Sequence, residues 1–427
     1  MSNENQHIPS GYKPSPLGII PKDWEVKRLG EVCNFLRNNT LSRKQLNDTN
    51  GKVQNIHYGD ILVKYPSILN ACTESIPYVN QEDYKDTLTD FIEDGDVIMA
   101  DTAEDETVGK ACEITNVDSK QILAGLHTML IRPQKGLFAS SFLGYHINSN
   151  SYRKQLTALM QGIKVCSLGK QVIANTFLLL PPLSEQKRIC DLLSLWDTTI
   201  EKQTALIEKL TLRKRGLMQQ LLTGKKRLKG FSGEWGYHKI QDHFTEIRDK
   251  NDGKGHIPMT ISAKVGLVSQ THKFDRIVAG NSLDKYTLLH KGDFAYNKGN
   301  SNLYEMGCIY RLKEESAVVP FVYICFRVVD DTCCEFYQQF FINHGLDKQL
   351  KQIITSGARG DGLLNVNSED FMALKIPYPP IKEQQAIASI LNNADKEIEL
   401  AKEKLLHLQK QKRGLMQVLL SGKKRVK

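Results

Sequence analysis

The chain has 427 residues, of which 41% are hydrophobic and 25% are charged, and its formal net charge is +9. These proportions exclude a disordered or fibrous chain, and the length predicts roughly two to four domains. Because no stretch approaches the roughly 18 apolar residues that span a bilayer, and no basic-then-apolar signal opens the chain, we expect a cytoplasmic protein.

Residues 21–180 predict a mixed α+β domain, preceded by an N-terminal segment of residues 1–20. Short β-rich runs at residues 96–99, 128–131 and 176–180 alternate with turn signals, and a helical stretch covers residues 142–160. Trp24 opens this domain, and a Gly-Asp pair at residues 95–96 marks a turn within it.

Residues 181–229 predict a long helix. Apolar residues recur every seven positions in two series, which begin at Ile189 and Leu193. Such a seam, sustained over about five heptads, is typical of a coiled coil. Gly224 ends the helix, and the Lys-Lys-Arg run after it suits a helix C-terminus or a phosphate-facing position. About 40 helical residues at about 1.5 Å each would give a spacer of roughly 60 Å.

Residues 230–378 predict a second mixed α+β domain. Trp235 opens it as Trp24 opens the first, and a second Gly-Asp pair follows the first at an offset of 197 residues. A β-rich run is expected at residues 318–326. Since the landmarks keep their order while most side chains differ, we interpret the two domains as diverged copies.

Residues 379–427 repeat the long helix. They align with residues 181–229 without a gap and are identical at 23 of 49 positions, where average composition would give roughly three. We therefore expect the two helices to pack against each other as an antiparallel coiled coil. Lys214 and Lys412 take seam positions, where a polar side chain can fix register and partner choice. Gly216 and Gly414 predict a kink or a close approach of the helices.

Three sets of motifs accompany this layout, namely Ile19-Ile20-Pro21-Lys22-Asp23-Trp24, Pro181-Pro182-Leu183-Ser184-Glu185-Gln186, and the paired Arg-Gly-Leu-Met-Gln and Leu-Leu-Thr/Ser-Gly-Lys-Lys-Arg stretches. Layout and motifs together resemble the specificity subunit of type I restriction–modification enzymes, from about Gly18 to the end of the chain. Two departures are Lys382 in place of Ser184 and a glycine-rich run at residues 356–362 without a counterpart.

The resemblance implies a bilobed α+β protein with pseudo-twofold symmetry. Its two target recognition domains would each read one half of a bipartite site on double-stranded DNA, and its helices would set their separation. It also implies partners, namely two adenine methyltransferase (modification) subunits and ATP-dependent restriction subunits. The residues alone leave a second class open, a coiled-coil scaffold with two protein-binding domains, which would show no sequence-restricted adenine methylation.

We expect no catalytic residue, no cofactor and no metal in this chain. The Asn/Asp-Pro-Pro-Tyr box of amino-methyltransferases is missing, and residues 162–170 lack the glycine spacing and the following hydroxyl residue of a phosphate-binding loop. The nine cysteines form no C-x-x-C pair, and the eleven histidines show no metal-ligand spacing, so His127 and His146 are interpreted as packed or surface residues. The chemistry is therefore expected on the partner subunits.

DNA recognition needs cations near phosphates and polar side chains that reach base edges. Lys164 and Arg359 each follow a glycine by two residues, in equivalent loops of the two domains. The loops at residues 101–107 and 298–304 differ between the domains, as half-site specificity requires. We therefore expect DNA contacts from Lys164, Arg359, Thr102, Lys298, Asn300 and Asn302, with a solvated loop position as the alternative for each.

Overall fold

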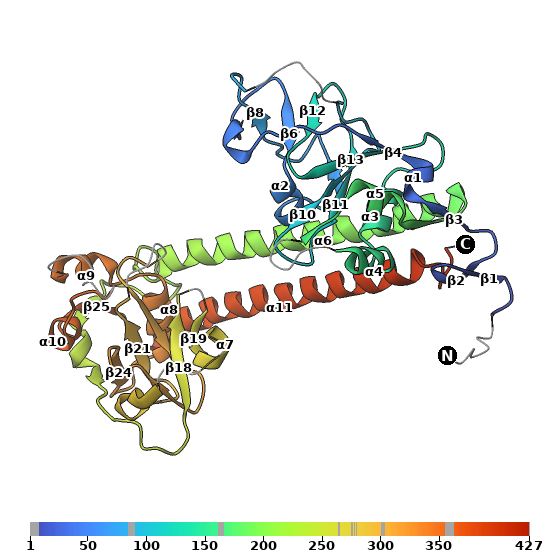
Figure 1. The fold of residues 1–427 in the computed structure, drawn as a ribbon. Helices are drawn as coiled ribbons and strands as arrows, with labels where there is room; N and C mark the ends of the chain where they lie inside the picture. The colour runs from blue at the N-terminus through green and yellow to red at the C-terminus, as the bar shows by residue number, and fades with distance from the viewer. Residues whose placement is uncertain are drawn as a thin grey trace. The chain divides into compact units, whose positions relative to one another are not determined.

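The structure is a computed structural model. It describes residues 8–83, 90–160, 166–263, 265–274, 276, 278, 280–299, 304–354 and 363–426, with residue 281 described by its backbone alone. The chain divides into two compact units, residues 1–203 with 404–427, and residues 204–403. Each unit combines one α+β domain with one half of each long helix (Figure 1).

The domain of the first unit is built on two sheets, with strand orders β4-β13-β9-β11-β7 and β12-β6-β8-β5 among the described residues. Its strands are β1 (Tyr12–Ser15), β2 (Gly18–Pro21), β3 (Glu25–Arg28), β4 (Cys33–Leu36), β5 (Leu46–Asn47), β6 (Gln54–Ile56), β7 (Ile68–Asn70), β8 (Tyr78–Val79), β9 (Val97–Ala100), β10 (Thr102–Ala103), β11 (Ala111–Thr115), β12 (Ile122–Ala124), β13 (Thr128–Pro133), β14 (Cys166–Ser167) and β15 (Phe177–Leu180). Its helices are α1 (Leu29–Val32), α2 (Tyr58–Val63), α3 (Phe142–Ile147), α4 (Asn150–Leu159) and α5 (Lys170–Ala174), with a 3-10 turn η1 (Arg43–Gln45).

Strand β9 shows why this domain folds in layers. Its four residues are all buried, and successive side chains point to opposite faces of the sheet. Val97 and Met99 pack on the side of α3 and α4, whereas Ile98 and Ala100 pack on the side of α2 and the second sheet. A strand buried on both faces reads as a continuous apolar run, as residues 97–100 do.

The second unit repeats this plan, with strand orders β17-β24-β21-β22 and β19-β18-β23-β20 among the described residues. Stacked and edge-to-face rings fill its core, including Phe244, Phe294 and Phe326. Its elements are β16 (Gly236–Lys239), η2 (Ile240–Asp242), β17 (Phe244–Glu246), β18 (Ile257–Ser262), β19 (Gly266–Ser269), α7 (Gln270–Phe274), η3 (Gly280–Lys285), β20 (Thr287–His290), β21 (Phe294–Asn297), β22 (Cys308–Arg311), β23 (Ser316–Val319), β24 (Ile324–Val328), α8 (Cys334–Ile342), α9 (Asp347–Ile353), α10 (Ser368–Met372) and β25 (Lys375–Tyr378).

Two of the predicted elements are wrong in their continuity. The helix expected at residues 142–160 is two helices, because the side chain of Asn148 bonds the carbonyls of Ala111 and Gly144 and Ser149 caps α4. The strand expected at residues 318–326 is two strands, β23 and β24, separated around Pro320, which cannot donate to a ladder. Strands β9, β13 and β15 lie within a residue or two of the predicted runs.

The Gly-Asp landmarks of the two domains are structural. Asp96 accepts a bidentate pair of hydrogen bonds from Arg132, and Asp293 accepts one from Arg327. Each aspartate also accepts a backbone N–H from three residues earlier, and the glycine before it has a φ of +88° or +99°. The pair therefore closes a tight turn and ties it to the neighbouring strand.

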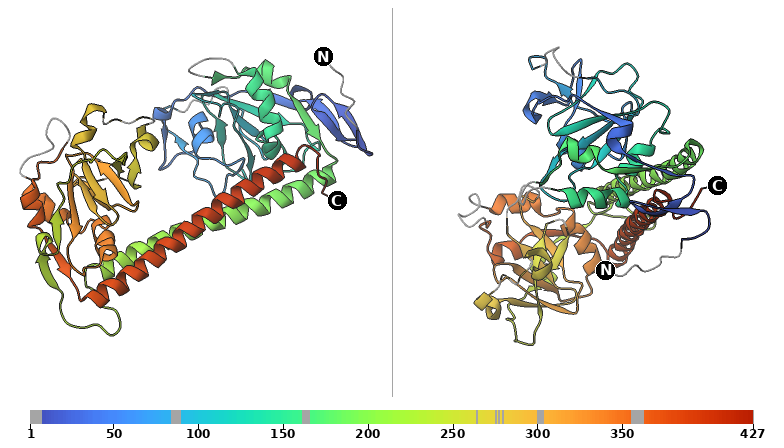
Figure 2. Two further views of the ribbon diagram at one scale, coloured as in Figure 1. Left: turned by 90° about the horizontal axis from the view of Figure 1, so that it is seen from below. Right: turned by 45° about the vertical axis from the view of Figure 1, so that its right-hand side comes forward.

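The long helices are α6 (Leu183–Leu221) and α11 (Ile381–Leu419). In the first unit, Ile189 and Leu193 near the start of α6 pack with Leu419 near the end of α11. In the second unit, Leu391 near the start of α11 packs with Leu221 near the end of α6. Within each unit the helices thus run antiparallel, as Figures 1 and 2 show. Among the described helices, none combines the length and apolar character that a bilayer crossing needs.

Each seam lysine is paired with an aspartate of the opposite helix. Lys412 bonds Asp197 in the first unit, and the Lys214 Nζ lies 2.6 Å from Asp395 Oδ1 in the second. Both lysines are largely buried, with side-chain exposures of 15% and 14%. A half-buried charge pair at one place in an apolar seam penalises every shifted alignment, so these pairs fix the register.

In each unit, the domain also contacts the aspartate that pairs with the seam lysine. The Tyr145 hydroxyl of α3 donates to Asp197 at 2.7 Å, and the Gln339 amide of α8 donates to Asp395 at 2.8 Å. Burial raises the pKa of Tyr145, so the hydroxyl stays a donor. The helix pairing and the docking of the domain therefore depend on one carboxylate in each unit.

A charged clasp closes the helix ends in the first unit. Arg425, after the end of α11, donates two hydrogen bonds to Glu185 at the start of α6 and two to Asp23. The Trp24 indole N–H donates to the same Glu185 at 3.0 Å. Both Trp24 and Glu185 are buried, so the shared motifs around them belong to the scaffold.

The second unit has the equivalent clasp. Arg227, after the end of α6, donates two hydrogen bonds to Glu383, which is fully buried and also accepts the Trp235 indole N–H at 3.1 Å. The arginine of each Lys-Lys-Arg tail thus pairs with a carboxylate in the protein. These pairs give the two arginines a structural role, and a phosphate-facing position stays a prediction for the exposed lysines beside them.

Gly216 and Gly414 lie inside the continuous helices. A Cβ at either position would meet no described atom within 4 Å, so the expected close approach does not occur there. Gly216→Ala is expected to raise the free energy of unfolding by about 1 kcal/mol, because alanine loses less backbone entropy in a helix. Gly224→Ala is the matched control and should destabilise, since Gly224 has a φ of +68° and lies against Trp235. Urea unfolding of both variants measures the effects, and a loss of stability in Gly216→Ala would contradict the first.

His146 is fully buried in α3, where its Nε2 accepts the Leu179 N–H at 3.2 Å. Burial lowers the pKa of this imidazole to about 4. In the unfolded chain this imidazole is protonated near pH 6.5, whereas in the folded protein it stays neutral down to about pH 4. The contribution of His146 to stability is therefore lost as the pH falls from about 6.5 to about 4.

His146→Gln keeps an acceptor for Leu179 but does not titrate. The parent loses stability through His146 as the pH falls and the variant does not. The unfolding free energy of the variant minus that of the parent is therefore expected to rise by about 2 kcal/mol between pH 7 and pH 5. Burial raises the pKa of Glu113 to about 7, so the contribution of Glu113 to stability changes with pH in the opposite direction. Glu113 is present in both proteins, and its contribution therefore cancels in the comparison. Urea unfolding at several pH values gives the difference, and a constant difference would show that His146 does not titrate as its burial requires.

Candidate nucleic-acid interface

Four strand ends meet at one edge of the first domain. Strands β4 and β9 end there because both run antiparallel to β13, which begins there. Strands β6 and β12 run parallel and end at the same edge, where Gly125 donates to the Ile56 carbonyl at 2.9 Å. Polar residues follow these ends, namely Asn38, Asn39, His57, Tyr58, Asp101, Thr102 and His127.

At this edge, the loop at residues 101–107 is hydrogen-bonded to the segment at residues 166–168, and both belong to the predicted interface. Strand β10 pairs with β14, which sets Thr102 opposite Ser167, and the Leu168 N–H donates to the Asp101 carbonyl at 2.9 Å. The loop at residues 101–107 therefore lies beside the end of the loop that contains Lys164. Lys164 itself is outside the described residues.

Thr102 lies among polar groups. Its hydroxyl donates to Asp101 Oδ1 at 2.8 Å and lies 3.4 Å from His127 Nδ1. The loop that follows also carries Glu104, Asp105 and Glu106. These carboxylates repel phosphates, so Thr102 is better placed for a base edge than for the DNA backbone.

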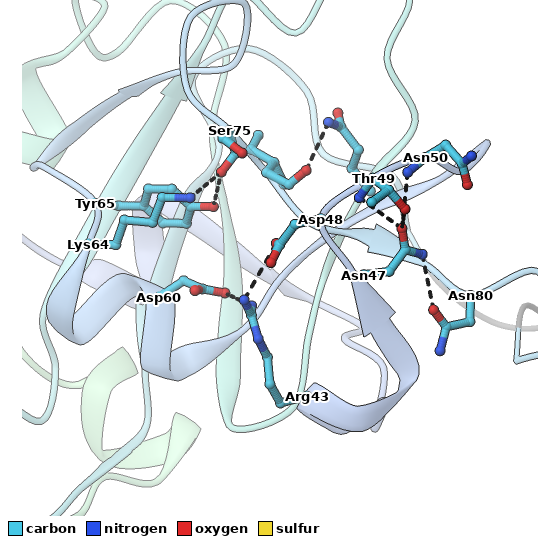
Figure 3. Close-up of polar contacts among 12 residues, drawn as sticks. Arg43, Asn47, Asp48, Thr49, Asn50, Asp60, Lys64, Tyr65, Ser75 and Asn80 are labelled. Atoms are coloured by element: carbon cyan, nitrogen blue, oxygen red, sulfur yellow. Dashed lines mark hydrogen bonds and ion pairs between the residues drawn. The ribbon is translucent and has the colours of Figure 1, made fainter. Parts of the chain in front are cut away.

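Figure 3 shows the contacts of basic and amide side chains on η1 and β5 of the same domain. Arg43 is half-exposed and lies between Asp60, at 2.9 Å, and Asp48, at 3.6 Å. Both ends of the Asn47 side chain make hydrogen bonds within the protein. Its side-chain oxygen accepts two backbone N–H groups, and its amide donates to Asn80 at 3.0 Å. Arg43 was missed by the sequence analysis, since nothing in its local sequence marks it.

The second domain joins its loops in the same way. Strand β21 ends at Asn297, Gly299 forms a bridge with Leu363, and the Leu364 N–H donates to the Lys298 carbonyl at 2.9 Å. The Lys298 ammonium donates to the Val366 carbonyl at 3.2 Å, which holds the returning segment. Asn300, Asn302 and Arg359 lie outside the described residues.

The family profile described as "Type I restriction modification DNA specificity domain" matches residues 21–212 and 286–410. The chain belongs to this family, and the α+β tandem fold expected from the repeat is confirmed. Its function therefore lies in DNA target specificity within a type I restriction–modification system.

Individual relatives agree with this assignment. The chain is 26% identical to the putative type I restriction enzyme MjaX specificity subunit of Methanocaldococcus jannaschii, over 97% of each chain. It is 23% identical to the EcoKI specificity subunit of Escherichia coli, over 60% of this chain and 59% of that one. Among solved structures, a chain from a study of complex assembly in the type I R-M system superposes with a TM-score of 0.60 at 16% identity, covering 94% of this chain and 99% of that one. The S subunit from M. genitalium gives 0.51 at 13% identity, covering 93% and 96%.

Proposed function

We propose that this chain reads a bipartite target on double-stranded DNA, one half with each domain, as the specificity subunit of a type I restriction–modification complex. The observation that supports this most is the repeated loop pair. In each domain, the loop after the Gly-Asp strand joins the returning loop that carries a predicted cation. The scaffold is duplicated while the loop side chains differ, as two different half-sites require.

The proposed DNA contacts fall into two classes. Lys164 and Arg359 are proposed to contact phosphates. Each is a cation that follows a glycine by two residues, and the glycine permits close approach of the protein backbone to the DNA. Thr102, Asn300 and Asn302 offer hydroxyl and amide groups to base edges, and Lys298, whose ammonium also holds the Val366 carbonyl, offers a further donor from its loop.

The partners proposed are two adenine methyltransferase subunits and ATP-dependent restriction subunits, in a cytoplasmic host-defence complex. Exposed leucines on the long helices support docking of apolar partner surfaces. They are Leu183, Leu195 and Leu406 in the first unit, and Leu206, Leu212 and Leu400 in the second. The described residues contain no group of three or more His, Cys, Asp or Glu side chains placed to hold a metal ion.

Reconstitution with the host methyltransferase subunit tests the proposal. Mapping of methylated adenines should show one target, in which two specific half-sites flank an unread spacer of constant length. Methylation without a sequence preference, or co-purification with unrelated proteins and no methyltransferase, would favour the coiled-coil scaffold instead.

Lys164→Ala and Arg359→Ala test the phosphate contacts. Each substitution is expected to weaken DNA binding by the reconstituted complex and to lower the slope of log affinity against log salt by roughly one unit. The base preferences should stay the same, because phosphates carry no sequence information. Fluorescence titrations at several salt concentrations give the slope, and an unchanged slope in both variants would refute the assignment.

A further inference from the structure

His127 has an unusual backbone conformation. It lies between β12 and β13 with a φ of +54°, in the left-handed region that non-glycine residues rarely adopt. Its side chain is 48% exposed, so burial of the ring does not explain this conformation. Residues held in such conformations cluster at functional sites, because the surrounding structure must hold them there.

The turn before His127 is held at several points. Gly125 donates its N–H to Ile56, and its carbonyl accepts from the Asn38 amide at 3.2 Å and from the Thr128 hydroxyl at 2.6 Å. The His127 carbonyl accepts the Asp101 N–H at 3.1 Å. The left-handed conformation is therefore imposed by a rigid turn that joins three strand ends.

The imidazole is oriented by its neighbours. Its Nδ1 lies 3.5 Å from Asp101 Oδ1 and 3.4 Å from the Thr102 hydroxyl, and its ring meets Tyr58 edge-to-face with centroids 5.3 Å apart. Within the described part of the chain, no residue bonds its Nε2. One nitrogen is thus fixed toward the domain, and the other is available at the strand-end edge.

Buried amides beneath this edge provide a second, independent observation. Asn55 is fully buried, and its Nδ2 donates to Asn39 Oδ1 at 2.9 Å. The remaining atoms of this pair, Asn55 Oδ1 and Asn39 Nδ2, are buried without a partner among the described residues. Gly125 fits against Asn55 only because it has no Cβ, which would lie 2.2 Å from Asn55 Oδ1. Unsatisfied buried groups and a left-handed backbone occur together at this edge, and both are features that cluster at functional sites.

We propose that His127 reads a base pair of the half-site bound by the first domain, through one hydrogen bond between Nε2 and a base edge. This inference rests on the proposed function. Asp101 is the positioning residue, because its carboxylate faces Nδ1 and orients the ring. Asp101 lies beside the imidazole, and residues 104–106 add three carboxylates to the loop that follows, so the negative charge disfavours a phosphate and leaves a base edge as the partner.

His127→Asn is the test variant, because asparagine tolerates the left-handed conformation and removes the ring. The variant complex, reconstituted with the methyltransferase subunit, is compared with the parent on DNA duplexes in which each base pair of both half-sites is varied. We expect discrimination to fall roughly tenfold at one base pair of one half-site. The other half-site and the salt slope should be unchanged, and Asp101→Asn should reduce discrimination at the same base pair only.

Two controls separate the possible outcomes. His344→Asn makes the same substitution at a second left-handed histidine, with φ of +60°, in the other unit, and should leave the first domain's half-site profile unchanged. His127→Gly keeps the turn without strain and replaces His127→Asn if the latter misfolds. A parent complex without base preference refutes the proposed function itself. A parent that discriminates, with an unchanged profile in the variants or with uniform weakening and a lower salt slope, refutes the role of His127 alone.

Discussion

A fragment that ends at Lys229 is expected to dimerise and to direct methylation to an interrupted palindrome built from one half-site. The fragment keeps the first domain and all of α6, but it loses the half of α11 that covers Ile189 and Leu193. The repeat offers a replacement, because Lys214 of a second copy can occupy the place of Lys412 opposite Asp197. Two identical readers about a twofold axis select a palindromic site.

The clasp should form in the same dimer. Arg227 of one copy would take the place of Arg425 against Glu185 of the other. Lys214→Glu in the fragment is expected to prevent dimerisation by placing a second carboxylate beside Asp197. Lys209→Glu, at an exposed position of the same helix, is the matched control and should dimerise normally. Light scattering and methylation mapping measure both properties, and a monomeric parent fragment, or a methylated site that retains the second half-sequence, would show that the domains are not interchangeable.

Glu383→Ala is expected to lower the free energy of unfolding of the second unit by about 3 kcal/mol. The substitution removes a fully buried carboxylate that accepts two hydrogen bonds from Arg227 and one from the Trp235 indole. Glu383→Gln should cost less, because the amide oxygen still accepts from the indole while the charge is lost.

An exposed ion pair provides the comparison. Glu315→Ala removes the partner of Lys291 where both side chains are more than half exposed, and should change stability by less than about 1 kcal/mol. Urea unfolding of both variants measures the two effects. Equal effects of Glu383→Ala and Glu315→Ala would mean that burial adds nothing to the clasp.

The helices could be predicted because their signal is local and duplicated. The heptad seam fixed α6 and α11, and the two lysines within it marked the positions that pair with Asp197 and Asp395. The sheets could not be ordered from the sequence, since β9 pairs with β13 and β11 through contacts that no local pattern encodes. The break at Asn148 was missed for the same reason, because its partner Ala111 is distant in sequence.

The candidate interface could be predicted only in outline. Glycine spacing pointed to the loops of Lys164 and Arg359, but the pairing of each with the loop after the Gly-Asp strand appears only in three dimensions. His127 was interpreted as a packed or surface histidine, because histidine carries no sequence signal for a left-handed backbone. Its place beside Asp101 depends on the antiparallel pairing of β9 with β13.

The clasp of Arg425 with Glu185 also has a consequence for synthesis of the chain. The first unit consists of residues 1–203 and 404–427, whereas the second is the continuous segment 204–403. The Tyr12 hydroxyl donates to the Gly422 carbonyl, and Arg425 follows almost at the end of the chain. During translation the second unit has all of its residues before the first does. The first unit therefore lacks residues 404–427 until the second unit has been synthesised, and until then its half of the α6 seam is open to any matching helix, including that of another nascent chain.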